Sequence, residues 1–290
     1  MDIREIFEGV LLGFVQGVTE FLPVSSSGHL ALFGDIILSN EKSMDLFTGI
    51  LLHLGTLGAV LVVFAREIFP VFLSPFIGFA KHRSALRTYE PLRLLGLVLL
   101  ASIPVALAGL FFGGEVEKLM QSPRIVACLL ACTGIILLAT EYYLRKREHP
   151  ADPDTSAGKK NPSVKQALLI GLAQAAAIFP GLSRSGLTIS AARLCGLQRE
   201  RAGVFSFLLF IPAVAGATLL ETVELLRAEQ PCSCFPAAAS ISAFHIAGFI
   251  ASFVFGFLAL TFLVRLLKSG RFHIFGWYCL AAAIFWFTAL

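Results

Sequence analysis

The chain has 290 residues, of which 57% are hydrophobic and only 14% are charged, and its mean hydropathy is +0.81. A soluble domain carries about 25% charged residues, and a single globular core has no room for this much apolar surface. The composition therefore excludes a soluble domain, the net charge of +4 gives no indication of nucleic-acid binding, and an all-α polytopic membrane protein is expected.

The N-terminal part of the chain contains an interrupted apolar stretch. The opening residues, MDIREIFE, are more acidic than basic and no small-residue cleavage site follows, so we expect no cleaved signal peptide. The stretch at 9–38 is broken by LPVSSSG at 22–28, and neither half has the roughly 20 apolar residues that span a bilayer. Irregular backbone at membrane depth must be surrounded by protein or water, so this pattern predicts a re-entrant hairpin.

The rest of the chain contains several longer apolar stretches. A second interrupted stretch, 164–197, contains PGLSRSG at 180–186 and predicts a second re-entrant hairpin. The segment 68–80 is too short to span and is predicted to lie along the membrane interface. Six stretches are long enough to span the bilayer: 46–65, 91–112, 124–144, 203–220, 242–264 and 272–289. The predicted fold class is thus an all-α membrane protein with six transmembrane helices and two re-entrant hairpins.

The two interrupted stretches align without a gap when the sequence is shifted by 158 residues. GFVQGVTEFLPVSSSGHL (13–30) then lies over GLAQAAAIFPGLSRSGLT (171–188), with six identical positions. Each half is one hairpin followed by three spans, and this odd number inverts the second half. We therefore predict inverted repeats at 1–145 and 164–290 in one membrane domain, joined by a polar cytoplasmic linker at 146–163. Such repeats place a site near the midplane, where the broken helices meet.

The basic residues predict which side of the membrane each end occupies. Most lysines and arginines fall in the segments 66–93, 145–165, 193–201 and 265–271, which this topology places on one side. Positively charged loops stay in the cytoplasm, so both termini are predicted on the outer side.

The two hairpin tips share a sequence that suits anion binding. Each has the form Ser-x-Ser-Gly before an apolar helix, and a helix N-terminus offers unpaired N–H groups and partial positive charge, most often used for phosphate. Arg184 adds a permanent cation with forked donors. A structural ion pair with Glu20 is the alternative for Arg184, and both could hold in different states. The predicted phosphate-binding residues are Ser25, Ser27, Ser183, Arg184, Ser185, Gly186 and Thr188.

The first tip also carries candidates for metal binding and catalysis. Gln16 and Glu20 share a helix face, and one carboxylate together with substrate phosphate oxygens is a usual way to hold magnesium. A proton-carrying role for Glu20 in a transporter is the alternative. His29 follows Ser26 by three residues, a spacing that can place base beside nucleophile. The predicted catalytic residues are Glu20, Ser26, His29 and Arg184.

Other polar residues of the apolar segments give weaker signals. His53, Thr56 and His245 lack an acidic or serine-rich context and are interpreted as helix-packing hydrogen bonds. Cys232 and Cys234 form a CxC pair in a predicted loop, whose oxidation or metal binding the sequence leaves open. There is no CxxC pair, which disfavours a structural zinc site.

The two motifs resemble those of a known family, the undecaprenyl-diphosphate phosphatases, also called bacitracin-resistance proteins. Members carry (Glu/Gln)-x-x-x-Glu followed by PVSS-x-GH, and later PG-x-SRSG-x-T; here these are QGVTEFLPVSSSGHL and PGLSRSGLT. The similarity extends over nearly the whole chain. The separate lipid phosphatases with an SR-x5-H motif are excluded, because Ser190 stands where their second histidine would be.

The resemblance implies a bacterial inner-membrane hydrolase with its active site open to the periplasm. It would convert undecaprenyl diphosphate to undecaprenyl phosphate and inorganic phosphate, recycle the lipid carrier for peptidoglycan synthesis and confer bacitracin resistance. The implied cofactor is magnesium or calcium, held more loosely here because many members have glutamate at the position of Gln16. The expected partners are the polyprenyl diphosphate and membrane lipids, and the resemblance is compatible with a homodimer.

Two questions stay open at the level of sequence. The nucleophile is either Ser26, with His29 accepting its proton, or a water molecule activated by His29 or Glu20. The rival class is a transporter or lipid flippase, because inverted repeats and a midplane carboxylate are typical of transporters too. Transport alone, however, does not require a Ser–His pair beside an arginine-bearing phosphate cradle.

Overall fold

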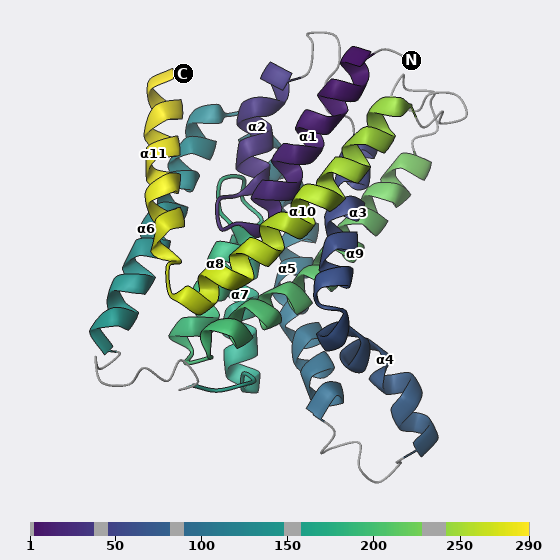
Figure 1. Cartoon of the computed structure of the whole chain (residues 1–290), viewed down its shortest axis with the longest axis vertical. Helices are drawn as coiled ribbons and strands as arrows, with labels where there is room; N and C mark the ends of the chain where they lie inside the picture. Colours follow the sequence, from purple (N-terminus) through teal and green to yellow (C-terminus); the bar gives the residue numbers. More distant parts are fainter. Residues whose placement is uncertain (1–2, 38–45, 82–89, 148–157, 228–241, 290) are drawn as a thin grey trace.

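The described part of the chain is helical. The computed structural model describes residues 3–37, 46–81, 90–147, 158–227 and 242–289, and within these ranges it forms eleven helices and one isolated β-bridge, between Lys159 and Leu197. The helices are α1 Ile3–Phe21, α2 Ser26–Ile37, α3 Leu46–Val63, α4 Ala65–Lys81, α5 Glu90–Met120, α6 Pro123–Arg147, α7 Val164–Ala176, α8 Arg184–Leu194, α9 Arg199–Arg227, α10 Ala243–Ser269 and α11 His273–Ala289 (Figure 1). Cys232, Cys234 and most of the predicted linker lie outside the described residues.

Within the described ranges, five helices are long and apolar enough to cross a membrane: α3, α5, α6, α9 and α10. They coincide with five of the six predicted spans, which confirms a polytopic helical membrane protein. The sixth predicted span, 272–289, becomes α11, an apolar helix of 17 residues. The number of six spans therefore stays a prediction. The segment 68–80 forms part of α4, whose interfacial position also stays a prediction.

Both interrupted stretches fold as two helices joined by a turn. The first gives α1 and α2, and the second gives α7 and α8. Proline cannot donate a backbone hydrogen bond, so Pro23 and Pro180 favour helix breaks there. Ser25 and Gly181 then reverse the chain with positive φ angles of 68° and 100°, a left-handed conformation that side chains other than glycine rarely adopt.

The helices that begin each hairpin pack closely against a long helix of the other half. α1 runs along α10, and α7 runs along α5. Both contacts require glycine: a Cβ atom on Gly13 would lie 2.7 Å from the Ala251 Cβ, and one on Gly171 would lie 2.9 Å from the Ala101 backbone. Small residues let helix backbones approach in this way inside membranes.

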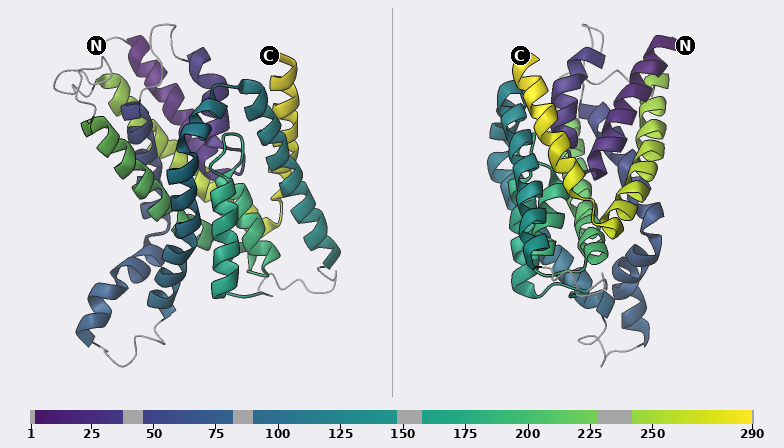
Figure 2. Two further views of the ribbon diagram at one scale, coloured as in Figure 1. Left: turned by 180° about the vertical axis from the view of Figure 1, so that it is seen from behind. Right: turned by 60° about the vertical axis from the view of Figure 1, so that its left-hand side comes forward.

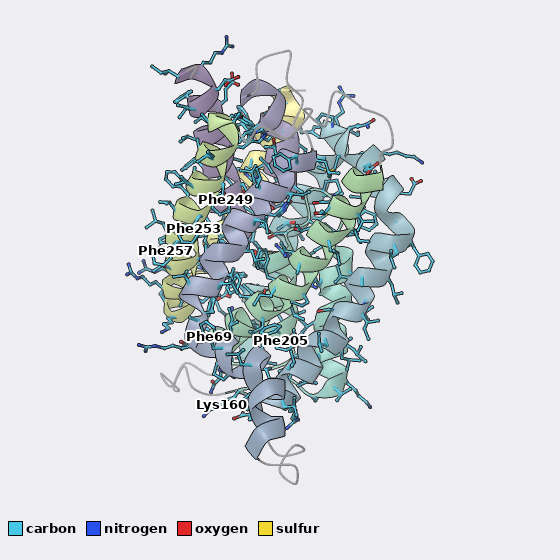
Figure 3. The ribbon with its side chains drawn as sticks, turned by 90° about the vertical axis from the view of Figure 1, so that its right-hand side faces the viewer. Phe69, Lys160, Phe205, Phe249, Phe253 and Phe257 are labelled. Atoms are coloured by element: carbon cyan, nitrogen blue, oxygen red, sulfur yellow. The ribbon has the colours of Figure 1, made fainter. Side chains whose placement is uncertain are left out.

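An aromatic core lies beneath the first hairpin tip. Phe21, which is fully buried at the end of α1, makes edge-on contacts with Phe207 and Phe210 of α9, with ring centroids 5.9 Å and 5.6 Å apart. On the outer side of the bundle, Phe249, Phe253 and Phe257 follow one another along α10 at one-turn intervals (Figure 3). The buried rings fix the end of α1, and with it the position of the adjacent Glu20.

The two ends of the bundle differ. The N- and C-termini lie at the same end, whereas α4, the start of α5, the end of α6 and the start of α7 lie at the other end (Figures 1 and 2). The turns of the two hairpins lie beside each other between these ends (Figure 2). This arrangement agrees with the predicted placement of both termini on one side of the membrane.

Candidate active site

A direct hydrogen bond joins the two hairpin tips. The Ser25 Oγ accepts from the Gly28 N–H of its own helix at 3.2 Å and from the Gly181 N–H of the other tip at 3.1 Å. Behind the second tip, Thr133 of α6 donates to the Gly181 carbonyl at 2.9 Å and accepts from the Ser183 N–H at 3.1 Å. The sequence prediction that the tips meet is thus confirmed.

Equivalent serines cap the two helices that leave the tips. The Ser183 Oγ accepts from the Gly186 N–H at 3.1 Å, as the Ser25 Oγ does from Gly28 at the start of α2. Each capped helix keeps further N–H groups in its first turn without an intrahelical partner, and these groups attract anions. Ser25 and Ser183 therefore cap these helices in addition to the phosphate contacts predicted for them.

A cavity of about 220 Å³ lies between the tips. Six of the predicted site residues line it: Glu20, Ser25, Ser26, Ser27, Ser183 and Arg184. Five others do not belong to its wall, namely Gln16, His29, Ser185, Gly186 and Thr188. The structure thus brings together the carboxylate, the candidate nucleophile and the arginine, which come from the two halves of the chain.

Glu20 and Arg184 form an ion pair across the cavity. An Arg184 Nη bonds to the Glu20 Oε1, the Gln16 Nε2 donates to the Glu20 Oε2 at 3.0 Å, and Ser26 lines the same cavity as this carboxylate. The Arg184 guanidinium lies 4.2 Å from the centre of the Phe210 ring. The Glu20 side chain is 2% exposed and that of Arg184 21%, so the arginine is the more accessible partner of the pair. The ion pair named as an alternative from the sequence is therefore formed in this structure.

His29 lies away from Ser26, and the expected Ser–His hydrogen bond is not formed. Its Nδ1 is 2.9 Å from the Ser25 carbonyl oxygen, and its Nε2 is 2.8 Å from the Tyr278 hydroxyl. A carbonyl oxygen only accepts, so Nδ1 carries a proton, and Nε2 shares a hydrogen bond with the Tyr278 hydroxyl. The spacing of three residues between Ser26 and His29 does not bring the two side chains together, because Ser25 turns the chain directly before α2 begins and the ring contacts Tyr278 instead. The catalytic role of His29 stays a prediction, but the expected pairing is corrected.

Three residues predicted to bind phosphate instead make hydrogen bonds that hold α8 in place. Thr188 is fully buried and donates to the Arg184 carbonyl at 2.7 Å, and its hydroxyl pairs with Ser206 of α9 at 2.6 Å. Ser185 pairs with the Ser183 hydroxyl at 3.3 Å, and Gly186 donates its N–H to that hydroxyl. These residues fix the orientation of α8, and the structure gives them no position on the cavity surface.

The cavity also contains polar residues that the sequence analysis did not select. His53 lines it together with Glu20, although its Nδ1 also bonds to the Gly49 carbonyl at 3.0 Å along α3. Its interpretation as a packing residue is thus incomplete, whereas Thr56 and His245 do bond locally, to the His53 carbonyl and Ser242. Gln174 and Glu221 also line the cavity, as do Thr19 and Thr218. A signal for Gln174 existed, since it is the repeat partner of Gln16.

The donor set suits a cation held partly by substrate. The described residues contain no cluster of three or more histidine, cysteine, aspartate or glutamate side chains that could hold a metal. Beside Glu20, however, the Gln16 Oε1 is buried without a hydrogen-bond partner. One carboxylate and one amide oxygen fit a hydrated magnesium or calcium ion that takes its remaining ligands from phosphate oxygens and water.

Comparison with known proteins identifies relatives over nearly the full length of the chain. A protein of Korarchaeum cryptofilum (strain OPF8) named undecaprenyl-diphosphatase is 37% identical over 281 residues, which cover 97% of each chain. Proteins of the same name from Bacteroides fragilis and Desulfosudis oleivorans are 37% and 38% identical over 276 and 283 residues, covering 95% of this chain and 94% and 95% of theirs. The family model described as bacitracin resistance protein BacA matches residues 9–285. The resemblance of the motifs is thereby confirmed, and the chain belongs to the bacitracin resistance protein BacA family.

Proposed function

We propose that this protein is an undecaprenyl-diphosphate phosphatase of the bacterial inner membrane. It hydrolyses undecaprenyl diphosphate to undecaprenyl phosphate and inorganic phosphate, recycles the lipid carrier for peptidoglycan synthesis and thereby confers bacitracin resistance. The observation that carries this proposal is the convergence of Glu20, Ser26 and Arg184 on one cavity between two helix N-termini. The names of the relatives agree with it.

We further propose six spans and two re-entrant hairpins in inverted repeats. The packing supports this arrangement, because α1 on α10 has its counterpart in α7 on α5 when the two halves are exchanged. The equivalent caps at Ser25 and Ser183 support it as well. With the basic segments in the cytoplasm, both termini lie in the periplasm and the cavity receives its substrate from that side.

Substrate binding, in this proposal, exchanges the partner of Arg184. The terminal phosphate of the diphosphate meets the N–H groups at the starts of α2 and α8 and accepts from the forked guanidinium. Because Arg184 then leaves Glu20, the carboxylate regains an oxygen that is free to accept a proton or to bind a cation. The Phe210 ring stays in contact with the guanidinium while Arg184 changes its partner from Glu20 to the phosphate.

The proposed reaction is phosphoryl transfer to the Ser26 hydroxyl. The Ser26 oxygen forms a bond to the terminal phosphorus while the bond from that phosphorus to the bridging oxygen breaks, and undecaprenyl phosphate leaves. Glu20, which lines the same cavity as Ser26, accepts the hydroxyl proton. Water then cleaves the serine phosphate and releases inorganic phosphate. Direct attack by a water molecule activated by Glu20 uses the same residues and gives the same products.

A magnesium or calcium ion is part of this proposal. Glu20 and Gln16 would hold it together with the phosphate oxygens of the substrate. When bound, it supplies positive charge that offsets the negative charge building up on the transferred phosphoryl group.

The test uses the full chain purified in detergent. We expect phosphate release from undecaprenyl diphosphate, lost on adding a chelator, and a fall in kcat of about 10²–10³-fold in Arg184→Ala, because a preorganised charge is removed from the developing phosphoryl charge. Arg184→Lys should recover only part of the rate, since lysine lacks the fork. Arg66→Ala, an exposed arginine away from the cavity, is the control. Movement of labelled lipid across vesicles without phosphate release would instead establish a transporter.

A further inference from the structure

The Gln174 side chain is a buried amide with no partner among the residues that the structure describes. It belongs to α7, is 1% exposed and lines the cavity between the hairpin tips. Within the described residues, neither its Oε1 nor its Nε2 has a hydrogen-bond partner. Leaving such a group unsatisfied is unfavourable, and native proteins contain few of them. An amide in this position therefore points to a ligand that enters the cavity.

The repeat shows why this amide lacks a partner. Gln16, at the equivalent position of the first half, donates to Glu20 one turn later on its helix. Four residues after Gln174 the chain has Ile178, whose side chain can accept no hydrogen bond. The second half thus has the same amide but an apolar group in place of the carboxylate, so the Gln174 N–H groups face a cavity instead of an internal acceptor.

The cavity has polar and apolar lining residues, and Gln174 is one of them. Glu20, Ser26 and Arg184 are part of its polar lining. Its apolar wall consists of Val105 of α5, Ala177 and Ile178 in the turn after α7, and Val214 and Ala217 of α9, which also contributes the polar Thr218 and Glu221. Gln174 stands two residues before the end of α7, so the apolar residues Ala177 and Ile178 follow it closely in the chain.

We infer that Gln174 binds the phosphate that stays attached to the lipid, through a hydrogen bond from its Nε2 to a non-bridging oxygen. The inference rests on the proposed function: the terminal phosphate lies against Arg184, the polyprenyl chain lies along the apolar wall, and the lipid-attached phosphate stands between them. This phosphate is the leaving group. A donor on it offsets the negative charge that it gains as the bond to the bridging oxygen breaks.

Two substitutions and one control test the assignment in detergent-purified protein. Gln174→Met keeps the size but loses the donor, and Gln174→Glu keeps an acceptor while adding charge. We expect kcat/KM for undecaprenyl diphosphate to fall about tenfold in Gln174→Met, equivalent to about 1.4 kcal/mol, and further in Gln174→Glu. Gln121→Met, at an exposed position away from the cavity, should leave kcat/KM unchanged.

Product inhibition separates the two phosphates of the substrate. In Gln174→Met the inhibition constant of undecaprenyl phosphate should rise by the same factor as kcat/KM falls, while that of inorganic phosphate stays within twofold. Weaker inhibition by inorganic phosphate alone, or unchanged inhibition by both, would overturn the inference. If the unmodified protein released no phosphate at all, the proposed function would fail, and direct binding of undecaprenyl phosphate to both proteins would still test Gln174.

Thermal stability separates a substrate-binding role of Gln174 from a structural role, because the two roles predict opposite changes in Gln174→Met. Methionine removes an unsatisfied amide from a buried site, so Gln174→Met should be at least as stable as the unmodified protein while being less active. A clear loss of thermal stability would mean that the amide serves the folded protein itself, and the assignment to substrate would be abandoned.

Discussion

At the scale of single residues, the pairing of Arg184 with Glu20 makes carboxylate and phosphate competitors for one guanidinium. Glu20→Gln removes the competing charge, so we expect the affinity for inorganic phosphate, the product that carries the terminal phosphorus, to rise by roughly tenfold in the presence of chelator, since a hydrogen bond to a charged group contributes about 1.5–3 kcal/mol. Turnover should fall steeply in the same variant, because the proton acceptor is lost. Equilibrium binding and phosphate release, measured on one preparation, check both expectations.

A second carboxylate serves as the control for this experiment. Glu221→Gln also removes one negative charge from the cavity wall, but it leaves the ion pair between Glu20 and Arg184 intact. A specific competition predicts that binding tightens much less in Glu221→Gln than in Glu20→Gln. Equal tightening in the two variants would show a general electrostatic effect of the cavity and would contradict the exchange of partners at Arg184.

Sequence alone identified some cavity residues and misplaced others, for a physical reason. Glu20, Ser26 and Arg184 were found because a charge or a serine cluster in an apolar segment is costly unless it has a task. His29 and Thr188 belong to the same motifs, but the direction in which a side chain points depends on the turn before its helix. His53 was undervalued because its acidic neighbour, Glu20, comes from a different helix and is invisible to local sequence context.

At the scale of secondary structure elements, Ser25 and Ser183 cap equivalent helices but contribute differently to stability. Ser25 alone also bonds to the opposite tip, at Gly181. Losing a cap costs about 1 kcal/mol and losing one further hydrogen bond about 1 kcal/mol more. We therefore expect Ser25→Ala to lower the apparent melting temperature, measured at a fixed heating rate, more than Ser183→Ala does.

A third variant separates hydrogen bonding from backbone strain at the first tip. Alanine keeps the Cβ atom at the left-handed φ of 68°, whereas Ser25→Gly loses the same hydrogen bonds but relieves the strain. Ser25→Gly should thus melt above Ser25→Ala. If Ser25→Ala and Ser183→Ala melted together, the bond between the tips would contribute nothing measurable to stability.

The position of each helix follows from hydropathy more closely than its length does. The span predicted at 91–112 becomes part of α5, which continues to Met120. Hydropathy detects only the part of a helix that suits hydrocarbon, whereas Glu115 and Lys118 pair on the exposed face at 2.7 Å and let the helix continue. The interruptions at both tips were predictable because proline breaks the helix wherever it stands in a membrane.

At the scale of the whole molecule, the two termini lie at the same end of the bundle, and the open question is which side of the membrane this end faces. The basic segments lie toward the end opposite the termini, so the positive-inside tendency places Lys268 in the cytoplasm and Lys118 in the periplasm. Both side chains are more than half exposed, at 56% and 72%, and so are suited to labelling.

Cysteine labelling in intact bacteria turns this orientation into a measurement. In a background where the six native cysteines are replaced by serine, Lys118→Cys should react with a membrane-impermeant maleimide from outside. Lys268→Cys should react only after the cells are permeabilised. Retained phosphatase activity of the cysteine-free protein shows that the fold is intact. The reverse pattern would turn the cavity toward the cytoplasm and refute a periplasmic entry for the substrate, because the termini, the first hairpin and the cavity mouth would all change sides together.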